Sequence, residues 1–402
     1  MKPEATIQSE KYAKNIRVYP TYRFFVNMLI IGPILVPYML FKGMSYSQIM
    51  LLQSISAISV FIFEIPTGTI ADKISRKLSL SLGGIFLGMG LLLYIIFKSF
   101  YIFAIAEIIF GIGLTFNSGA DAAILYESLK KLDRKKEYQK MEGHAAFLIF
   151  IGQAVGSIFS GFLYKYNPSL PFWISLVNIF IAVIVATSFK DTERKKSEHT
   201  YLVHVFKSIH ISFKTPRILW TVLFAALMGF SFRVSFWLYQ PYFQTVNIDV
   251  QWFGVIFFFF NMIAAFSSKV LVKKYYDTRP RKILISLAFL LAFTYLLPAL
   301  LIFPWAIAII GLQQIIRGLY NPTLRFYINH QIKDEYRATV LSLVSLTASL
   351  SFAIFSPFVG ISLDKSGTIP TYIWMGTITV GGTLMLILLR KLQKIKKYRS
   401  NE

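Results

Sequence analysis

Residues 64–80 read Glu-Ile-Pro-Thr-Gly-Thr-Ile-Ala-Asp-Lys-Ile-Ser-Arg-Lys-Leu-Ser-Leu. One apolar segment runs into this stretch and another begins at Leu78, so the charged residues lie in a short turn between two hydrophobic helices. Pro66 lacks a backbone N–H, and we expect it to break the helix between Glu64 and Asp72. The stretch therefore predicts a charged hairpin that joins two apolar helices.

The composition predicts the class of protein. Apolar residues make up 55% of the 402 residues and charged residues 15%. The apolar residues fall in blocks of about 20, the length at which an α-helix crosses a bilayer. These blocks are apolar on all sides, unlike the helices of a soluble protein, and they are too long and unbroken for the strands of a membrane barrel. We expect an all-α polytopic membrane protein.

The apolar blocks give twelve candidate transmembrane spans. They are Thr21–Phe41, Ser47–Ile70, Leu78–Phe97, Tyr101–Leu125, His144–Tyr164, Leu170–Phe189, Ile218–Tyr239, Trp252–Val272, Ile283–Phe303, Trp305–Tyr327, Thr339–Leu363 and Thr371–Leu389. A polar, charged connection divides them into six and six, with weak similarity between the halves. The predicted parts are an N-terminal tail (1–20), a first bundle (21–189), a linker (190–217), a second bundle (218–389) and a C-terminal tail (390–402).

The net charge of +23 has a strongly one-sided distribution over the predicted loops. Lys and Arg gather in both tails and in alternate loops, which by the positive-inside rule places both termini in the cytoplasm and the chain in the plasma membrane. We expect anionic membrane lipids, not nucleic acid, as the counter-charge, since no soluble module offers a basic face. The chain has no cysteine and its histidines show no ligand spacing, so we predict neither a metal site nor a cofactor.

The hairpin and the arrangement of six plus six spans resemble the major facilitator superfamily. That family carries Gly-x-x-x-Asp-Arg/Lys-x-Gly-Arg/Lys-Arg/Lys after its second helix, and Ser75 here replaces the second glycine. The matching residues are Gly68, Asp72, Lys73, Arg76 and Lys77. The resemblance implies two pseudo-symmetric six-helix bundles.

By the same resemblance, the hairpin is a conformational gate. Asp72 would approach the positive end of the helix that begins near Thr339, and Arg76 would pair with Asp121 or Glu127. These contacts would form only while the cytoplasmic side is closed.

Charged residues inside apolar spans are costly and usually face a cavity or a partner. Glu107 stands where the family's Arg-x-x-x-Gly-x-Gly segment has its arginine. It is a candidate for proton coupling or cation recognition, modulated by Arg233 or Arg317, or else a member of a structural ion pair. Glu64 is a further candidate, either titrating during transport or bracing the helix end.

Polar residues in spans that line the family's central cavity are candidate substrate contacts, although membrane amides often only bridge helices. They are Asn27, Tyr239, Gln240, Gln313, Gln314 and Asn321. The fifth span looks like the family's antiporter signature, but small residues at this spacing also simply permit close helix packing. Its residues are Gly152, Gly156, Ser160 and Gly161.

We therefore expect a monomeric secondary transporter that works by alternating access and binds a small molecule between its halves. No ATP-binding loop is present, and the resemblance favours proton-coupled export of a small amphipathic compound. Uptake or facilitated diffusion of a metabolite is the alternative. A membrane-embedded enzyme would need clustered His, Asp or Glu residues, which we do not find; a non-transporting sensor stays open.

Replacement of Asp72 by Asn should slow transport without changing membrane insertion, because the substitution removes a charge–dipole contact of about 0.3–1 kcal/mol. Initial transport rates, normalised to the amount of inserted protein, check this. An unchanged rate would contradict the gate.

Overall fold

The computed structural model describes residues 3–191, 215–267, 280–332 and 334–399. The chain divides into two compact units. Unit 1 comprises Met1–Met44, Ile55–His199 and Val250–Phe259, and unit 2 comprises Ser45–Ser54, Thr200–Asp249 and Phe260–Glu402. The predicted linker at 190–217 lies almost wholly outside the described residues.

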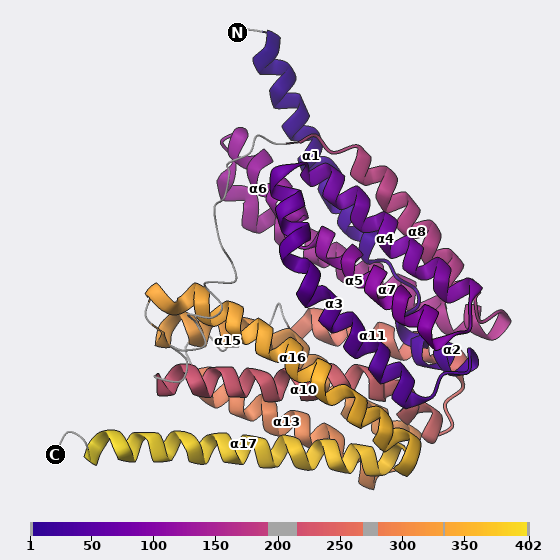
Figure 1. Cartoon of the computed structure of the whole chain (residues 1–402), viewed down its shortest axis with the longest axis vertical. Coiled ribbons are helices and arrows are strands. Elements are labelled where there is room, and N and C mark those ends of the chain that lie inside the picture. The colour runs from indigo at the N-terminus through magenta and orange to yellow at the C-terminus, as the bar shows by residue number, and fades with distance from the viewer. Residues whose placement is uncertain (1–2, 192–214, 268–279, 333, 400–402) are drawn as a thin grey trace. The chain divides into compact units, whose positions relative to one another are not determined.

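Unit 1 is a bundle of packed helices (Figure 1). It contains α1 (Pro3–Asn27), η1 (Gly32–Ile34), α2 (Leu35–Phe41), most of α3 (Tyr46–Lys73), α4 (Arg76–Ile96), α5 (Phe100–Asn117), α6 (Ala120–Lys131), η2 (Lys135–Glu137), α7 (Tyr138–Tyr166), α8 (Leu170–Thr187), η3 (Val250–Trp252) and the start of α11 (Phe253–Phe266). Helix α4 packs against α5 and α8, while α1 packs against α6, α7 and α8.

Unit 2 is arranged around α10 and α13, with α17 lying along both (Figure 1). It contains the first turns of α3, then α10 (Pro216–Thr245), the rest of α11, α13 (Pro280–Leu300), η5 (Pro304–Ala306), α14 (Ile307–Gly311), α15 (Gln313–Gln331), α16 (Asp334–Ser366) and α17 (Thr368–Arg399). Helix α10 packs against α16 and α17, and α13 against α15 and α17.

Ten helical segments of the described residues are long and apolar enough to cross a membrane, and Val250–Phe266 is a shorter apolar helix. These segments confirm the prediction of an all-α polytopic membrane protein. Between helices of each unit, buried tyrosine hydroxyls donate to backbone carbonyls. Tyr38 bonds to Tyr94 O at 3.0 Å, Tyr295 to Ser231 O at 2.6 Å and Tyr372 to Leu238 O at 3.1 Å.

Three predicted spans are interrupted where we expected continuous helices. The first span breaks at residues 28–31, just before Pro33, which has no N–H to continue the helix. The freed backbone groups find partners on α8: Asn178 donates to Met28 O at 3.0 Å and Ser175 accepts from Ile30 N–H at 3.0 Å. Such partners are required because hydrocarbon offers none.

The fourth and tenth predicted spans break at other positions. Helix α5 ends at Asn117 and α6 begins at Ala120, because Gly119 takes a positive φ of 77° that a helix cannot contain. In the tenth span the helix tightens by one turn of 3₁₀ type at Leu312. There the N–H of Leu312 donates to Ile309 O and the N–H of Ile315 donates to Leu312 O. At each interruption, polar residues lie beside backbone groups that have lost their partner within the helix.

The predicted break at Pro66 is wrong, since α3 continues from Tyr46 to Lys73. The neighbouring threonine hydroxyls bond back to helix carbonyls, Thr67 to Phe63 O at 2.7 Å and Thr69 to Ile65 O at 2.9 Å. A membrane helix tolerates proline when nearby Ser or Thr side chains bond to its backbone in this way.

The first turn of α3 is anchored within unit 2 by Asp364, near the end of α16. The Asp364 carboxylate accepts from the N–H groups of Tyr46 at 2.9 Å and Ser47 at 2.8 Å, and from the Ser47 hydroxyl. These are the N–H groups that a helix start leaves without partners, and the helix dipole favours a negative charge there.

The small residues of the fifth predicted span lie at close contacts of α7 within unit 1. A Cβ on Gly161 would overlap the carbonyl oxygens of Val250 and Gln251, while a Cβ on Gly152 would lie 3.2 Å from the Phe24 ring. Gly156 faces Ile30 at the break of α1, and the Ser160 hydroxyl bonds to Ser157 O at 2.7 Å. Small side chains are what permits this approach.

We expect Gly161→Ala to destabilise the protein by about 1–3 kcal/mol, because the added methyl group meets backbone that must shift. Gly143→Ala is the matched control in the same helix, since a Cβ there meets nothing within 4 Å. That control should be neutral or stabilising by up to about 1 kcal/mol. Thermal unfolding in detergent measures both variants, and equal stability would contradict the assigned contact.

Candidate functional site

The hairpin is a two-residue turn, Ile74–Ser75, between α3 and α4. Ser75 has an extended backbone (φ −170°) and caps α4, because its hydroxyl accepts from Leu78 N–H at 2.9 Å. Ser75 also donates to Asp191 at 2.7 Å. This geometry needs no glycine, which explains why serine fits here. Asp191 was not foreseen, since its position after the sixth span gives no sequence signal.

The acidic partner of the hairpin is Glu127. Arg76 Nη1 lies 2.5 Å from Glu127 Oε2. Glu127 is one of the two partners that we expected for Arg76. Lys73 is exposed and Lys77 is half-buried. A Cβ on Gly68 would meet nothing within 4 Å in the described part of the chain, so no helix packs closely against Gly68 there.

The predicted contact of Asp72 with the helix near Thr339 involves side chains outside those that the structure describes.

Asp121, the other expected partner of Arg76, pairs with Arg23 of α1. Arg23 NH2 also lies 4.0 Å from Glu142 Oε1 on α7, and Tyr19 donates to Glu142 Oε2 at 2.6 Å. We call Tyr19, Arg23, Asp121 and Glu142 the Arg23 cluster. The sequence did carry a signal for Arg23, because it is a charged residue inside the predicted first span.

Glu107 is buried between α5 and α4, with 5% of its surface exposed, and accepts a hydrogen bond from the Tyr94 hydroxyl. Its expected modulators have partners inside unit 2. Arg233 donates to Ser349 at 3.3 Å and lies 4.9 Å from the centre of the Phe352 ring. Arg317 donates to Asn261 Oδ1 at 2.9 Å.

A buried polar cluster in unit 2 joins α10 to the start of α15. The Tyr239 hydroxyl donates to Gln313 Oε1 at 2.7 Å and accepts from Gln314 Nε2 at 3.2 Å. Both glutamines are at most 3% exposed. Among the described residues, the Gln313 Nε2 donor and the Gln314 Oε1 acceptor have no hydrogen-bond partner. Unmade bonds of this kind are costly in a core and suit a polar ligand.

The remaining candidates take other positions. Asn27 donates to Arg23 O at 2.9 Å, so it bonds to the last turn of α1. Gln240 is buried, whereas Glu64 and Asn321 are exposed.

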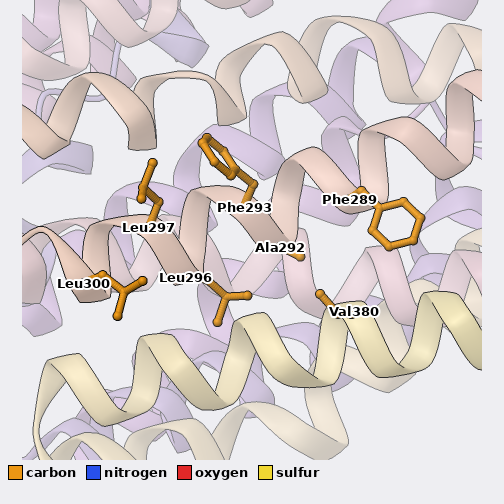
Figure 2. A pocket seen from close by; sticks show the side chains of 7 residues that line it. All are labelled: Phe289, Ala292, Phe293, Leu296, Leu297, Leu300 and Val380. Atoms are coloured by element: carbon orange, nitrogen blue, oxygen red, sulfur yellow. The ribbon is translucent and has the colours of Figure 1, made fainter.

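A groove of about 300 Å³ lies between α13 and α17 (Figure 2). It is lined by Phe289, Ala292, Phe293, Leu296, Leu297, Leu300 and Val380. Every lining side chain is hydrocarbon, so the groove offers no group that could orient a polar substrate. In the described ranges, no three His, Asp or Glu side chains are arranged to hold a metal ion.

Comparison with known families gives one match across most of the chain. The model of the Major Facilitator Superfamily matches residues 24–354. Among relatives, the MFS-type transporter YxaM of Bacillus subtilis is 23% identical over 83% of this chain and 87% of its own. The quinolone resistance protein NorA of Staphylococcus aureus is 22% identical over 94% of this chain and 96% of its own.

Solved structures share the fold. The nucleoside transporter NupG superposes with a TM-score of 0.75 at 13% identity, covering 93% of this chain and 99% of its own. A D-xylose-proton symporter superposes with a TM-score of 0.70 at 15% identity, covering 93% and 96%.

Tyr239→Phe should destabilise the protein by about 1–3 kcal/mol, because Gln313 Oε1 and Gln314 Nε2 would both lose their partner. Gln314→Met keeps the length of the side chain and removes an unpaired oxygen together with one long hydrogen bond, so it should change stability by less than about 1 kcal/mol. Thermal unfolding in detergent compares them, and equal losses would contradict the central position of Tyr239.

Proposed function

Since the chain belongs to the major facilitator superfamily, we propose that it is a secondary active transporter that exports a small amphipathic compound in exchange for protons. It works by alternating access, with both termini in the cytoplasm and the plasma membrane as its location. The family match and the relatives, which align over most of their length, make this chain a multi-pass membrane transporter of the superfamily.

The observation that carries the proposal is the polar cluster around Tyr239. It is buried in a membrane-spanning unit, where polar groups are expensive, and it leaves one donor and one acceptor unpaired. A site with such groups gains most from a ligand that supplies the missing bonds. Tyr239 packs edge-on against the Phe260 ring at 5.4 Å, so an amphipathic molecule would meet both polar and aromatic surface.

Export is favoured by the similarity to the quinolone resistance protein NorA and by the small residues of α7. Uptake or facilitated diffusion is the competing direction. The sequence has no ATP-binding loop, which favours an ion gradient or the substrate's own gradient as the energy source. The family resemblance favours protons as the coupling ion. Glu107 stays a candidate for coupling or for structural pairing, and its bond from Tyr94 fits either role.

The hairpin is the proposed gate. Arg76 and Glu127 join α4 to α6, and the Ser75–Asp191 bond ties the same turn to the chain after α8. Both contacts lie within unit 1, so the Arg76 contact would persist when the transporter changes state, and only the Asp72 contact would form and break with closure of the cytoplasmic side. Asp72 would be carried as part of a rigid body. Rigid motion of bundles is the general mode of alternating access.

Cells that make the protein should accumulate less of a fluorescent amphiphile than cells that lack it, and a protonophore should abolish the difference. Gln314→Met should raise the concentration for half-maximal transport about tenfold, as expected for one lost hydrogen bond to the ligand. Thr377→Val is the control, because Thr377 is exposed on α17 and bonds only within its own helix.

Greater accumulation of the amphiphile in cells that make the protein would contradict export and support uptake. Equal accumulation in both kinds of cell, with the protein shown to be inserted, would contradict transport of this class of compound.

A further inference from the structure

The groove between α13 and α17 is apolar along its length and has basic residues beyond one end (Figure 2). Both helices supply candidate membrane spans, Pro280–Leu300 and Thr368–Leu392. The sequences of the two helices contain no acidic residue. Their basic residues stand only where α13 begins and where α17 ends: Arg281 and Lys282 on α13, and Arg390, Lys391, Lys394, Lys396, Lys397 and Arg399 on α17.

The basic ends of the two helices lie together. Helix α13 packs along α17, and the charge of Arg281 acts on Arg390. Arg217, from the first turn of α10, acts on Arg390 as well. The Arg281 side chain is turned into unit 2, since its Cζ lies 5.2 Å from the centre of the buried Trp220 ring. Like charges held together repel, so this end of unit 2 attracts an anion.

Two lysines stand on the helix faces that line the groove. Lys282 precedes Phe289 by about two turns and Phe293 by about three turns, so all three residues lie on one face of α13. Lys391 follows Val380 by about three turns on α17 and shares its face in the same way. Both lysines are exposed. The hydrocarbon groove therefore leads towards two ammonium groups.

The spacing along the helices matches the dimensions of a phospholipid. At 1.5 Å per residue, Phe289 lies about 10 Å from Lys282 along α13, and Val380 lies about 16 Å from Lys391 along α17. One leaflet contributes about 15 Å to the hydrocarbon core of a bilayer. A lipid whose phosphate lies at the two lysines therefore has its acyl chains at the depth of the near part of the groove.

We propose that α13 and α17 bind one anionic phospholipid, with its phosphate at Lys282 and Lys391 and an acyl chain in the groove. The hydrocarbon lining, which cannot orient a polar substrate, suits an acyl chain. The loop before α13 and the C-terminal tail are predicted to be cytoplasmic, and the cytoplasmic leaflet is rich in anionic lipid. The inference does not depend on which compound the protein transports.

Native mass spectrometry of the full-length protein tests the headgroup part of the site, with phosphatidylglycerol and phosphatidylcholine of identical acyl chains as the probes. The unsubstituted protein should retain one phosphatidylglycerol at least about tenfold more tightly than phosphatidylcholine. The double variant Lys282→Gln with Lys391→Gln should bind phosphatidylglycerol about thirtyfold more weakly, the loss expected for two lysine–lipid attractions. Its binding of phosphatidylcholine should not change.

The matched control for charge is Lys135→Gln with Lys136→Gln. These lysines are exposed on η2 of unit 1, in a loop predicted to lie on the same side of the membrane, so the control removes the same charge away from the groove. It should bind phosphatidylglycerol as the unsubstituted protein does.

Val380→Trp tests the acyl-chain part of the site, because the larger side chain fills the groove while every basic residue stays in place. It should weaken the binding of phosphatidylglycerol about tenfold. Met385→Trp is its control, since Met385 is 68% exposed on α17 and does not line the groove. Thermal unfolding in detergent establishes that each variant is folded.

Equal affinity of the unsubstituted protein for the two lipids would overturn the proposal, as would equal losses in the two double-lysine variants. Displacement of phosphatidylglycerol by an equal concentration of inorganic phosphate would assign the lysines to a free anion and contradict the lipid. A dimer that carries no lipid would assign the groove to a second copy of the chain and would also contradict it.

Discussion

A backbone group inside the membrane must find its hydrogen-bond partner within the protein, and the interrupted helices of this chain depend on that constraint. Where α1 ends, Ser175 and Asn178 replace the partners that the helix no longer supplies. Where α5 gives way to α6, Asp121 and Asn117 lie beside the break. At the start of α15, Gln313 and Gln314 follow the tightened turn at Leu312. Polar side chains in the membrane thus gather where helices stop.

The gathering of polar side chains at helix ends links the fold to the proposed function. An arginine in an apolar helix is costly, and the energy of burying Arg23 is recovered through its partners Asp121 and Glu142. The same partners fix α1 to α6 and α7, so the ionic cluster joins three helices of unit 1. In unit 2 the Tyr239 cluster joins helices in a comparable way, but with neutral groups and with unmade hydrogen bonds. The two clusters therefore differ in chemistry: the Arg23 cluster is ionic and the Tyr239 cluster is neutral.

Much of the fold was accessible from sequence, because blocks of about 20 apolar residues leave few alternatives to membrane helices. The hairpin also identified the family, and Arg76 lies against Glu127, one of its two expected partners. The interruptions were not accessible: Gly119 reads like any other membrane glycine, and Pro66 was expected to break a helix that continues. A proline or glycine marks a position where a helix can break. Nearby hydroxyl and amide groups that bond to the backbone decide whether the helix does break.

The candidate site was harder to predict, because its side chains come from helices whose contacts with each other cannot be read from the sequence. Arg233 or Arg317 was the expected modulator of Glu107, but the sequence carried no signal for the Tyr94 hydroxyl of the neighbouring α4, which donates to Glu107 within unit 1. Arg23 and Glu142, which the structure brings together, lie more than a hundred residues apart and belong to no shared motif. Sequence spacing places residues along a helix but does not say which neighbour they meet.

The central claim, that this chain is a proton-coupled transporter, is tested most directly by flux into proteoliposomes that contain only the purified protein. A fluorescent amphiphile should enter these vesicles faster than protein-free vesicles, and faster still when the lumen is made acidic so that protons leave in exchange. Entry equal to that of protein-free vesicles, with and without the pH gradient, would contradict it.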